Sequence, residues 1–295
     1  MSDSTVTPPD AAAAEYGQVD RVSRLVRRVL APNPGPFTYT GTGTYIVGSG
    51  TVAIVDPGPN DRDHIAALLA AVDGEVVSHI VVTHTHRDHS PAAIAVKAAT
   101  GARVVGCARL VLDDHGPRAD AGFDTTYAPD AILADGERVA GPGWTLTALH
   151  TPGHTSNHLC FALAEERALF SGDHVMGWST TVVAPPDGDM AAYIASLRRL
   201  LDRDDVVYYP THGAPVTEPQ RFVRGLITHR KQRENQILAR LEDGAATVPA
   251  LVATMYAAVD PRLHPAAGLS VTAHLIDLAV RGVVARRGDV WALAA

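Results

Sequence analysis

The 295-residue chain is poor in several residue types that mark particular classes of protein. Its two cysteines, Cys107 and Cys160, lie far apart and outside any metal-binding spacing, which indicates buried free thiols rather than a disulfide. No apolar run reaches the roughly 20 residues of a membrane-spanning helix, so we expect no membrane partner. The chain does not open with a basic segment followed by an apolar run, and a cytoplasmic protein is therefore expected.

Aromatic and basic side chains are also scarce. Aromatic residues make up 5% of the chain, and 25 basic residues face 32 acidic ones, which gives a net charge of −7. Because nucleic-acid surfaces depend on basic contacts and often on aromatic stacking, this composition disfavours a broad nucleic-acid interface. The apolar fraction of 46% is ordinary for a globular protein and is enough for a sizeable core.

The densest cluster of metal-binding side chains follows the apolar run Ile80–Val82. His84, His86, Asp88 and His89 fall within six residues of the chain. The preceding run predicts a buried strand that ends at the edge of a sheet. A single metal rarely takes so many ligands from one loop, so the spacing predicts two metals side by side.

Three further donors occur downstream, each beside small residues at the end of a β-rich stretch. Imidazole and carboxylate donors without thiolates suit zinc, and manganese and iron(II) accept the same ligands. We expect two divalent cations, with zinc as the first choice. The predicted ligands are His84, His86 and His154 for the first metal, Asp88, His89 and His212 for the second, and Asp173 as a bridge.

Two neighbouring cations can activate a water and stabilise a developing oxyanion. The sequence therefore predicts a metal-dependent hydrolase in which a metal-bound hydroxide attacks a carbonyl carbon or a phosphorus. Asp88 would be a catalytic residue that also orients the water. His158 is expected to form a hydrogen bond beside the site rather than to bind metal.

The first part of the chain has the alternation of an α/β protein. Thr44–Val47 and Val52–Val55 flank a Gly-rich turn and predict a hairpin. Asn60 is placed to cap the next helix, and Val76–Val82 reads as a buried strand. From Ile132 to Phe170 the pattern changes to alternating residues with frequent turns, which predicts a second, antiparallel sheet.

The composition changes again beyond Pro219. Gln220–Leu241 and Val248–Val259 predict two helices, and Ser270 is placed to cap a third. Gly282–Trp291 then reads as a small hairpin, so the C-terminal region is similar to a winged-helix unit. The predicted organisation is a flexible tail at residues 1–18, a first domain at 19–218 and a helical, winged-helix-like domain at 219–295.

Four motifs together resemble those of the metallo-β-lactamase superfamily. They are His84-Thr85-His86-Arg87-Asp88-His89, Pro152-Gly153-His154-Thr155, Ser171-Gly172-Asp173 and His212-Gly213. The resemblance covers residues from about 20 to 215. It implies an αββα sandwich, in which two facing sheets carry helices outside and a dinuclear metal site lies at one edge.

A narrower resemblance is to the β-lactamase-like-2 proteins. It is carried by the residues Asn33–Thr38, Gly41–Tyr45 and Gly177–Val182, and by the helical, winged C-terminal region. Animal members of that group are described as single-strand endoribonucleases, and related fungal members as thioesterases that act on carrier-bound polyketides.

The substrate is less clearly indicated. Ser179, Thr180, Thr181 and Tyr193 are candidate substrate contacts, or else hydroxyl groups that face water. The basic residues of the predicted Gln220–Leu241 helix either guide a phosphate or form a solvated face; they are Arg224, Arg230, Lys231 and Arg233.

The sequence is compatible with three functions. An ester or thioester hydrolase of small molecules fits the acidic charge and the scarcity of aromatic residues. A single-strand endoribonuclease fits the narrower resemblance, but not the charge. In the third, the winged region binds nucleic acid and the metals are structural; a set of seven ligands disfavours it, because a structural site needs neither a second metal nor an open position.

Overall fold

The computed structural model describes residues 14–112 and 122–294. This part of the chain divides into two compact units. The first comprises the residues up to Thr151, Asn157–Thr180 and Asp204–Pro219, and the second comprises Pro152–Ser156, Thr181–Arg203 and the residues from Gln220 onward. Residues 1–13 of the expected tail lie outside the described residues, and the domain boundaries at 19–218 and 219–295 stay a prediction.

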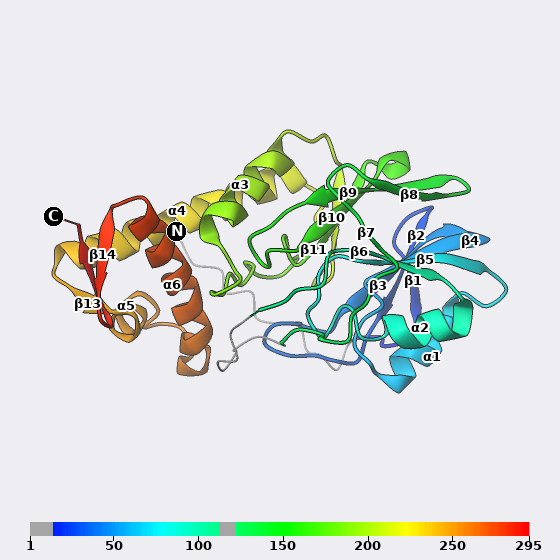
Figure 1. The fold of residues 1–295 in the computed structure, drawn as a ribbon, viewed down its shortest axis with the longest axis horizontal. Helices are drawn as coiled ribbons and strands as arrows, with labels where there is room; N and C mark the ends of the chain where they lie inside the picture. The colour runs from blue at the N-terminus through cyan, green and yellow to red at the C-terminus, as the bar shows by residue number, and fades with distance from the viewer. Residues whose placement is uncertain (1–13, 113–121, 295) are drawn as a thin grey trace. The chain divides into compact units, whose positions relative to one another are not determined.

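The first unit contains a seven-stranded sheet in the order β1-β2-β3-β4-β5-β6-β7. Its strands are antiparallel from β1 to β4 and parallel from β4 to β7. The helices α1 (Arg62–Ala71) and α2 (Ala93–Thr100) lie on the side of this sheet that faces away from β9–β11 (Figure 1). The strands are β1 (Val19–Arg21), β2 (Val26–Leu30), β3 (Gly43–Ser49), β4 (Thr51–Val55), β5 (Val76–Val82), β6 (Arg103–Gly106) and β7 (Ala131–Ile132).

The second sheet of this unit has five strands in the order β12-β11-β10-β9-β8. Both β9 and β11 are antiparallel to β10, and β12 is parallel to β11. The C-terminal ends of β9, β11 and β12 therefore lie at the same edge. The strands are β8 (Arg138–Gly141), β9 (Trp144–His150), β10 (Leu159–Leu163), β11 (Ala168–Gly172) and β12 (Val207–Pro210), and the 3₁₀ turn Ala164–Glu166 joins β10 to β11.

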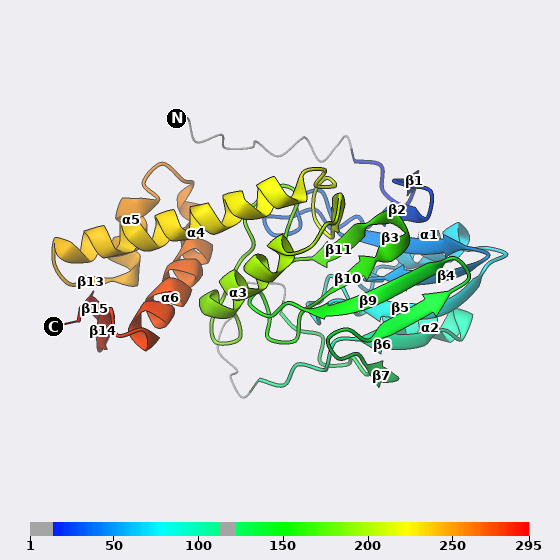
Figure 2. The ribbon, with the colours of Figure 1, turned by 90° about the horizontal axis from the view of Figure 1, so that it is seen from above.

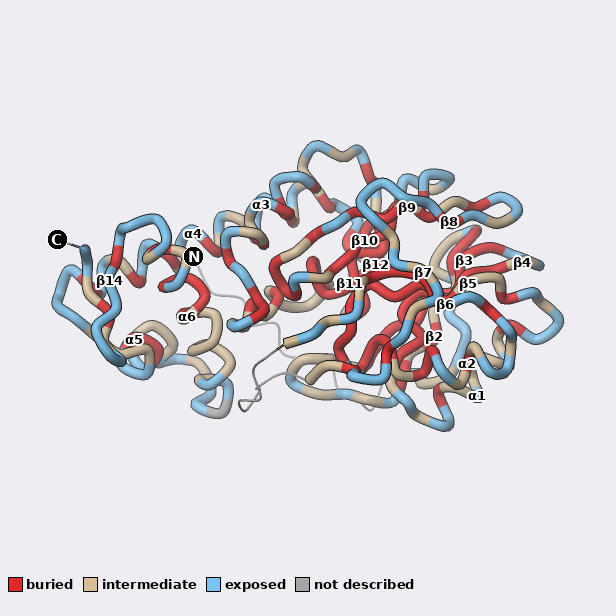
Figure 3. The backbone as a smooth tube through the Cα atoms, viewed as in Figure 1, coloured by how far each residue is buried: buried red, intermediate tan, exposed pale blue. Residues whose placement is uncertain are grey.

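The core of the first unit is built from residues of both sheets. Tyr45 of the first sheet contacts Phe170 of the second, with ring centroids 5.3 Å apart, and both side chains are buried. The strands β3 to β6 and β9 to β12 are buried along most of their length (Figure 3). The two facing apolar layers confirm the expected pair of sheets.

Trp144 occupies a close-fitting position between the sheets. A Cβ atom placed on Gly48 of β3 would lie 2.5 Å from its Cδ1, and one placed on Gly141 of β8 would lie 2.5 Å from its Cε2. Its indole N–H donates a hydrogen bond of 2.8 Å to the carbonyl of Thr51. Only glycine at both positions therefore leaves room for the indole.

The predicted hairpin is confirmed, since β3 and β4 pair across a tight turn. The predicted cap of α1 is wrong by one residue. The helix begins at Arg62, so Asp61 rather than Asn60 stands before it, and the Asp61 carboxylate accepts hydrogen bonds from the N–H groups of Asp63 (3.0 Å) and His64 (2.8 Å).

His64 on α1 predicts a measurable pH dependence of stability. Its side chain is fully buried, with Nε2 3.1 Å from the Pro57 carbonyl, and burial lowers its pKa from 6.5 to about 4. The unfolded chain takes up this proton near pH 6.5, whereas the folded chain does so only near pH 4. The contribution of neutral His64 is therefore present above pH 6.5 and decreases as the pH falls toward 4.

We expect the difference in the free energy of unfolding between the wild type and His64→Gln to decrease by about 3 kcal/mol, at the expense of the wild type, between pH 7 and pH 4. Urea unfolding of both proteins at several pH values measures it. An advantage that stays constant over this range would contradict the prediction.

The second unit contains four helices among its described residues: α3 (Met190–Leu201), α4 (Pro219–Glu242, whose first residue belongs to the first unit), α5 (Val248–Met255) and α6 (His264–Val280). Three short strands form a sheet in the order β13-β15-β14, with bounds Ala246–Thr247, Val290–Leu293 and Val284–Arg287. Figure 2 shows this sheet beside α5 and α6. Ile237, Leu275 and Trp291 are in the shared apolar core of these elements.

The predicted start of the third C-terminal helix is wrong. Helix α6 begins at His264, directly after a 3₁₀ turn at Pro261–Leu263, and Ser270 lies in its interior. Pro265 lies in the first turn of α6, where the backbone N–H groups make no hydrogen bonds within the helix, so a proline there costs none. Cys107 and Cys160 are free and buried, as expected. The described part of the chain has no helix with the length and apolar character needed to span a bilayer.

Candidate metal centre

All the predicted metal donors follow the C-terminal ends of strands. Since β4 and β5 are parallel, as are β11 and β12, strand ends of the same kind collect at one edge. The seven donor side chains are buried, with at most 9% of any residue exposed. His84, His86, Asp88 and His89 follow β5, His154 follows β9, Asp173 follows β11, and His212 follows β12.

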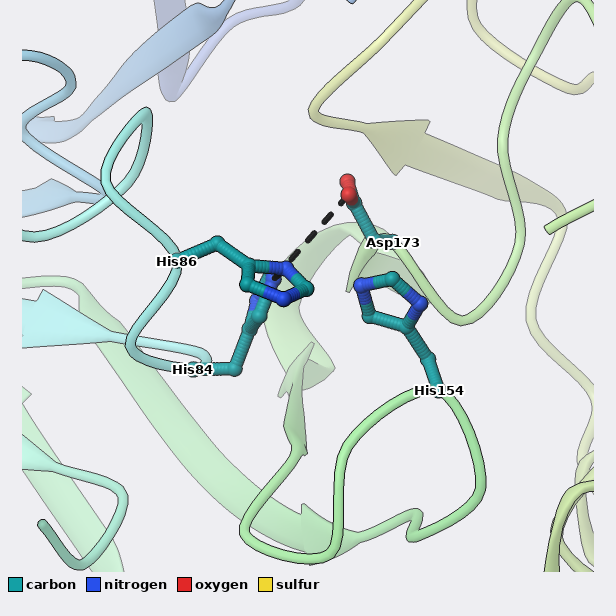
Figure 4. Close-up of side chains that lie close together, drawn as sticks. All are labelled: His84, His86, His154 and Asp173. Atoms are coloured by element: carbon teal, nitrogen blue, oxygen red, sulfur yellow. Dashed lines mark hydrogen bonds and ion pairs between the residues drawn. The ribbon is translucent and has the colours of Figure 1, made fainter. Parts of the chain in front are cut away.

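The donors form two groups. We call His84, His86, His154 and Asp173 the first donor group, and Asp88, His89 and His212 the second donor group. Within each group, one ligand atom from every residue lies within 4.8 Å of the others. The side chains of the first donor group point toward a common space (Figure 4), and His84 Nε2 lies 2.9 Å from His86 Nδ1.

The second donor group is equally compact. Asp88 Oδ2 lies 3.4 Å from His89 Nε2 and 3.1 Å from His212 Nε2. His89 Nε2 is buried and has no hydrogen-bond partner among the residues that the structure describes. A nitrogen lone pair in this position, beside a carboxylate, has the chemistry of a metal ligand.

Asp173 reaches both groups. Its Oδ2 lies 4.0 Å from His84 Nε2 in the first donor group and 3.5 Å from His89 Nε2 in the second, and its Oδ1 lies 3.4 Å from His212 Nε2. The two groups are therefore neighbours, and together they offer enough imidazole and carboxylate donors for two divalent cations.

The charges in this cluster are strongly coupled. Burial alone would raise the pKa of Asp88, but His89 and His212 outweigh it and hold the pKa of that carboxyl well below its usual range. Burial likewise opposes ionisation of Asp173, whose pKa is also held low by His212 and His89.

The histidines respond in the opposite direction. Burial would lower the pKa of His212, but Asp173 and Asp88 raise it to about 10. The pKa of His89 is also raised well above its usual range, because Asp88, Asp173 and Asp56 outweigh its burial. The two buried carboxylates are thus stabilised by positive charge nearby. Protons on the histidines and divalent cations can each supply this charge, so they compete for the same site.

Asp56 is a supporting residue that the sequence did not single out. Its buried carboxylate accepts hydrogen bonds from His89 Nδ1 (2.9 Å), from the N–H and hydroxyl of Thr83 (both 2.8 Å) and from the hydroxyl of Thr211 (3.2 Å). With Nδ1 of His89 bonded to a carboxylate, Nε2 is left to face the other donors. The available signal was its place at the end of β4, at the same edge as the ligands.

Other histidines are held by backbone carbonyls. His212 Nδ1 donates to Gly41 (3.1 Å), and His154 Nδ1 donates to Val182 (2.6 Å). Nε2 of His158 accepts a hydrogen bond of 3.3 Å from the N–H of Asp173. This last contact matches the hydrogen-bonding role expected for His158 beside the site.

The predicted substrate contacts have different surroundings. Ser179 and Thr180 are half-buried, whereas Thr181 and Tyr193 are buried. The Arg230 guanidinium lies over the Tyr193 ring at 5.2 Å and also donates to the Thr181 carbonyl. These four residues remain predicted substrate contacts.

The family model described as the metallo-beta-lactamase superfamily matches residues 39–212, more than half of the chain. The chain belongs to the metallo-β-lactamase superfamily. It is a metal-dependent hydrolase of this family, and its donor set fits divalent cations. A second model, the beta-lactamase associated winged helix domain, matches residues 247–291, which include α5, α6 and β14.

Related members of the superfamily agree with this assignment. The chain is 35% identical over 256 residues to an atrochrysone carboxyl ACP thioesterase of Aspergillus chevalieri, covering 82% of this chain and 76% of the relative. It is 35% identical over 229 residues to the beta-lactamase-like protein 2 homolog of Caenorhabditis elegans, covering 76% and 74%. A beta-lactamase domain protein from Burkholderia ambifaria shares the fold, with a TM-score of 0.79, 20% identity and 96% of each chain covered.

Proposed function

We propose that this hydrolase uses two metals to cleave a thioester or ester of a small molecule. The observation that carries the dinuclear part is the position of Asp173, within 4.0 Å of His84 in the first donor group and within 3.5 Å of His89 and His212 in the second. In this proposal the three histidines of the first donor group hold one cation, the second donor group holds the other, and Asp173 serves both.

The two cations, when bound, supply Lewis acidity and bring the pKa of a coordinated water toward neutrality. The protein's own groups orient the reaction. Asp88 is the carboxylate that we assign to water orientation, since its buried Oδ2 is also 3.5 Å from the Thr42 hydroxyl. Zinc is the expected metal, and manganese and iron(II) suit the same donors.

The segment that follows Asp173 is a candidate for substrate contact. The N–H of Gly177 donates to the carbonyl of His212 (2.8 Å), so the chain toward Ser179 and Thr180 starts beside a residue of the second donor group. Trp178 stacks on Tyr39, with ring centroids 4.8 Å apart. This aromatic pair offers a flat apolar surface for the acyl part of a substrate.

The thioester class is supported by the name of the Aspergillus chevalieri relative, an acyl carrier protein thioesterase, and by the net charge of −7. The alternative is cleavage of single-stranded RNA. It is supported by the winged-helix match and by basic residues on α4, such as Arg224. The two substrates differ in charge, so salt separates them, because binding to a polyphosphate weakens steeply as the salt concentration rises.

Hydrolysis assays test the proposal. The metal-loaded protein is offered acyl thioesters, aryl esters, lactones, phosphodiesters and short RNA, with His86→Ala as the control. We expect turnover of a thioester or ester that is lost in His86→Ala. RNA cleavage that depends on His86, with no ester or thioester turnover, would overturn the small-molecule assignment in favour of the alternative.

A further inference from the structure

The second unit contains a cavity of about 490 Å³ between α3, α4 and α6. This volume lies within the range of small-molecule pockets. The cavity belongs to residues of one unit and includes none of the metal donors. Its polar lining consists of Arg198 from α3, Arg230, Lys231 and Glu234 from α4, His274 and Asp277 from α6, and Arg281, which caps the C-terminus of α6.

The charges of this lining leave an excess of positive charge. Glu234 pairs with Lys231 (2.5 Å) and Arg281 (2.7 Å), and Asp277 pairs with Arg281 as well (2.9 Å). Lys231 and Arg281 thus balance the charges of the two carboxylates, Glu234 with both cations and Asp277 with Arg281. Arg198 and Arg230 add two further positive charges that these carboxylates do not neutralise.

Two buried polar groups of the cavity have unused hydrogen-bonding capacity. Arg230 is 3% exposed, and its Nε has no partner among the described residues. His274 is 2% exposed, and within the same described part of the chain neither of its ring nitrogens has one. A buried donor without a partner costs on the order of 1–3 kcal/mol, so the Arg230 Nε–H and the one N–H of the neutral His274 ring together indicate a ligand that accepts hydrogen bonds.

We propose that this cavity binds the phosphate group of a small phosphate-bearing molecule. An oxyanion with several acceptor oxygens can take hydrogen bonds from the Arg230 fork and from the His274 ring together. Arg198 is exposed at the cavity, where a flexible cation can close on a dianion. The remaining volume accommodates the organic part of the molecule, against the side chains of Ile194 and Ile227.

Arg230, which would bind the phosphate, also contacts the segment that holds the predicted metal ligand His154. Arg230 donates to the Thr181 carbonyl, and the carbonyl of the next residue, Val182, accepts from His154 Nδ1. A ligand that engages Arg230 therefore acts on the segment that orients His154. The binding test below does not depend on which substrate the metal centre hydrolyses.

The His274 ring is a local reporter for the test. Burial, Arg230, His229 and Arg281 lower its pKa to about 3, against an opposing effect of Glu234. A phosphate dianion beside the ring favours the protonated form, so its pKa rises when the ligand binds. Nuclear magnetic resonance of the labelled histidine rings observes this, with the His274 signal assigned by its loss in His274→Gln.

The titration uses the full-length, metal-loaded protein and inorganic phosphate, with chloride at matched ionic strength as the control. We expect a saturable shift of the His274 signal with phosphate and none with chloride. Phosphate that binds only at the metal centre would leave this signal unchanged and would overturn the proposal.

Two adjacent arginines give a matched pair of variants. Arg198 lines the cavity, whereas Arg199, which is also exposed on α3, does not. Arg198→Ala is expected to weaken the phosphate-dependent shift about tenfold, and Arg199→Ala to leave it unchanged. Equal affinities in the two variants would show that a general surface charge, rather than the cavity, attracts phosphate.

Discussion

Replacing Asp173 by alanine is expected to abolish hydrolysis and to remove most of the bound metal. The carboxylate of Asp173 lies within 4.0 Å of histidines in both donor groups. Its loss also leaves His212 without one of the two carboxylates that raise the pKa of that imidazole. Removing this one residue is therefore expected to disturb both proposed cation sites.

His86→Ala tests the first donor group alone. We expect turnover to fall below detection, and metal content to fall toward one ion per chain, because only the first group loses a ligand. Metal content is measured by plasma emission, and turnover with the best substrate from the hydrolysis assays. His150→Ala, at an exposed histidine at the end of β9, is the matched control. Normal turnover with full metal in either ligand variant would remove the basis of the assignment.

Asp56→Asn is expected to reduce metal affinity or activity by about 10- to 100-fold, the usual cost of losing a residue that orients a ligand. The asparagine keeps the shape but offers one carbonyl oxygen and an amide in place of two acceptor oxygens. It cannot satisfy Thr83, Thr211 and His89 as the carboxylate does. The orientation of His89 would be lost as a result.

The backbone adds to the demands at this position. Asp56 has a φ of +48°, which is uncommon for a residue other than glycine, and its hydrogen bonds help to hold it there. Thr211→Val removes only one of these bonds and is the graded control, for which we expect a smaller loss. Metal titration of both variants gives the affinities; an Asp56→Asn protein that binds metal like the wild type would rule out the orienting role.

The strand-end positions of the metal donors could be predicted from sequence because the signal is local. An apolar run followed by His84-Thr85-His86-Arg87-Asp88-His89 places the donors at a sheet edge before any long-range contact is known. The family resemblance added the facing sheets, which the separate runs could not supply. The predicted ligand roles and substrate contacts still await the experiments above.

The role of Asp56 could not be predicted, because it depends on distant contacts. Thr83, His89 and Thr211 are separated from it by 27, 33 and 155 residues. The start of α6 illustrates the opposite case: Ser270 is a good cap by residue type, but Pro265, five residues earlier, already lies in the first turn of the helix. A residue type that is common at helix caps also occurs inside helices, and the surrounding residues determine which position it takes.

The close packing of Trp144 restricts which substitutions this protein can accumulate during evolution. A methyl group at Gly48 or Gly141 collides with the indole, and a smaller side chain at 144 opens a void that neither glycine can fill. A change at Gly141 is therefore tolerated only together with a change at Trp144. Among homologues, alanine or a larger residue at Gly141 should accompany the disappearance of the tryptophan, whereas Gly48 should persist, because it also has a φ of +104° and a Cβ there would lie 2.8 Å from the Thr51 carbonyl oxygen.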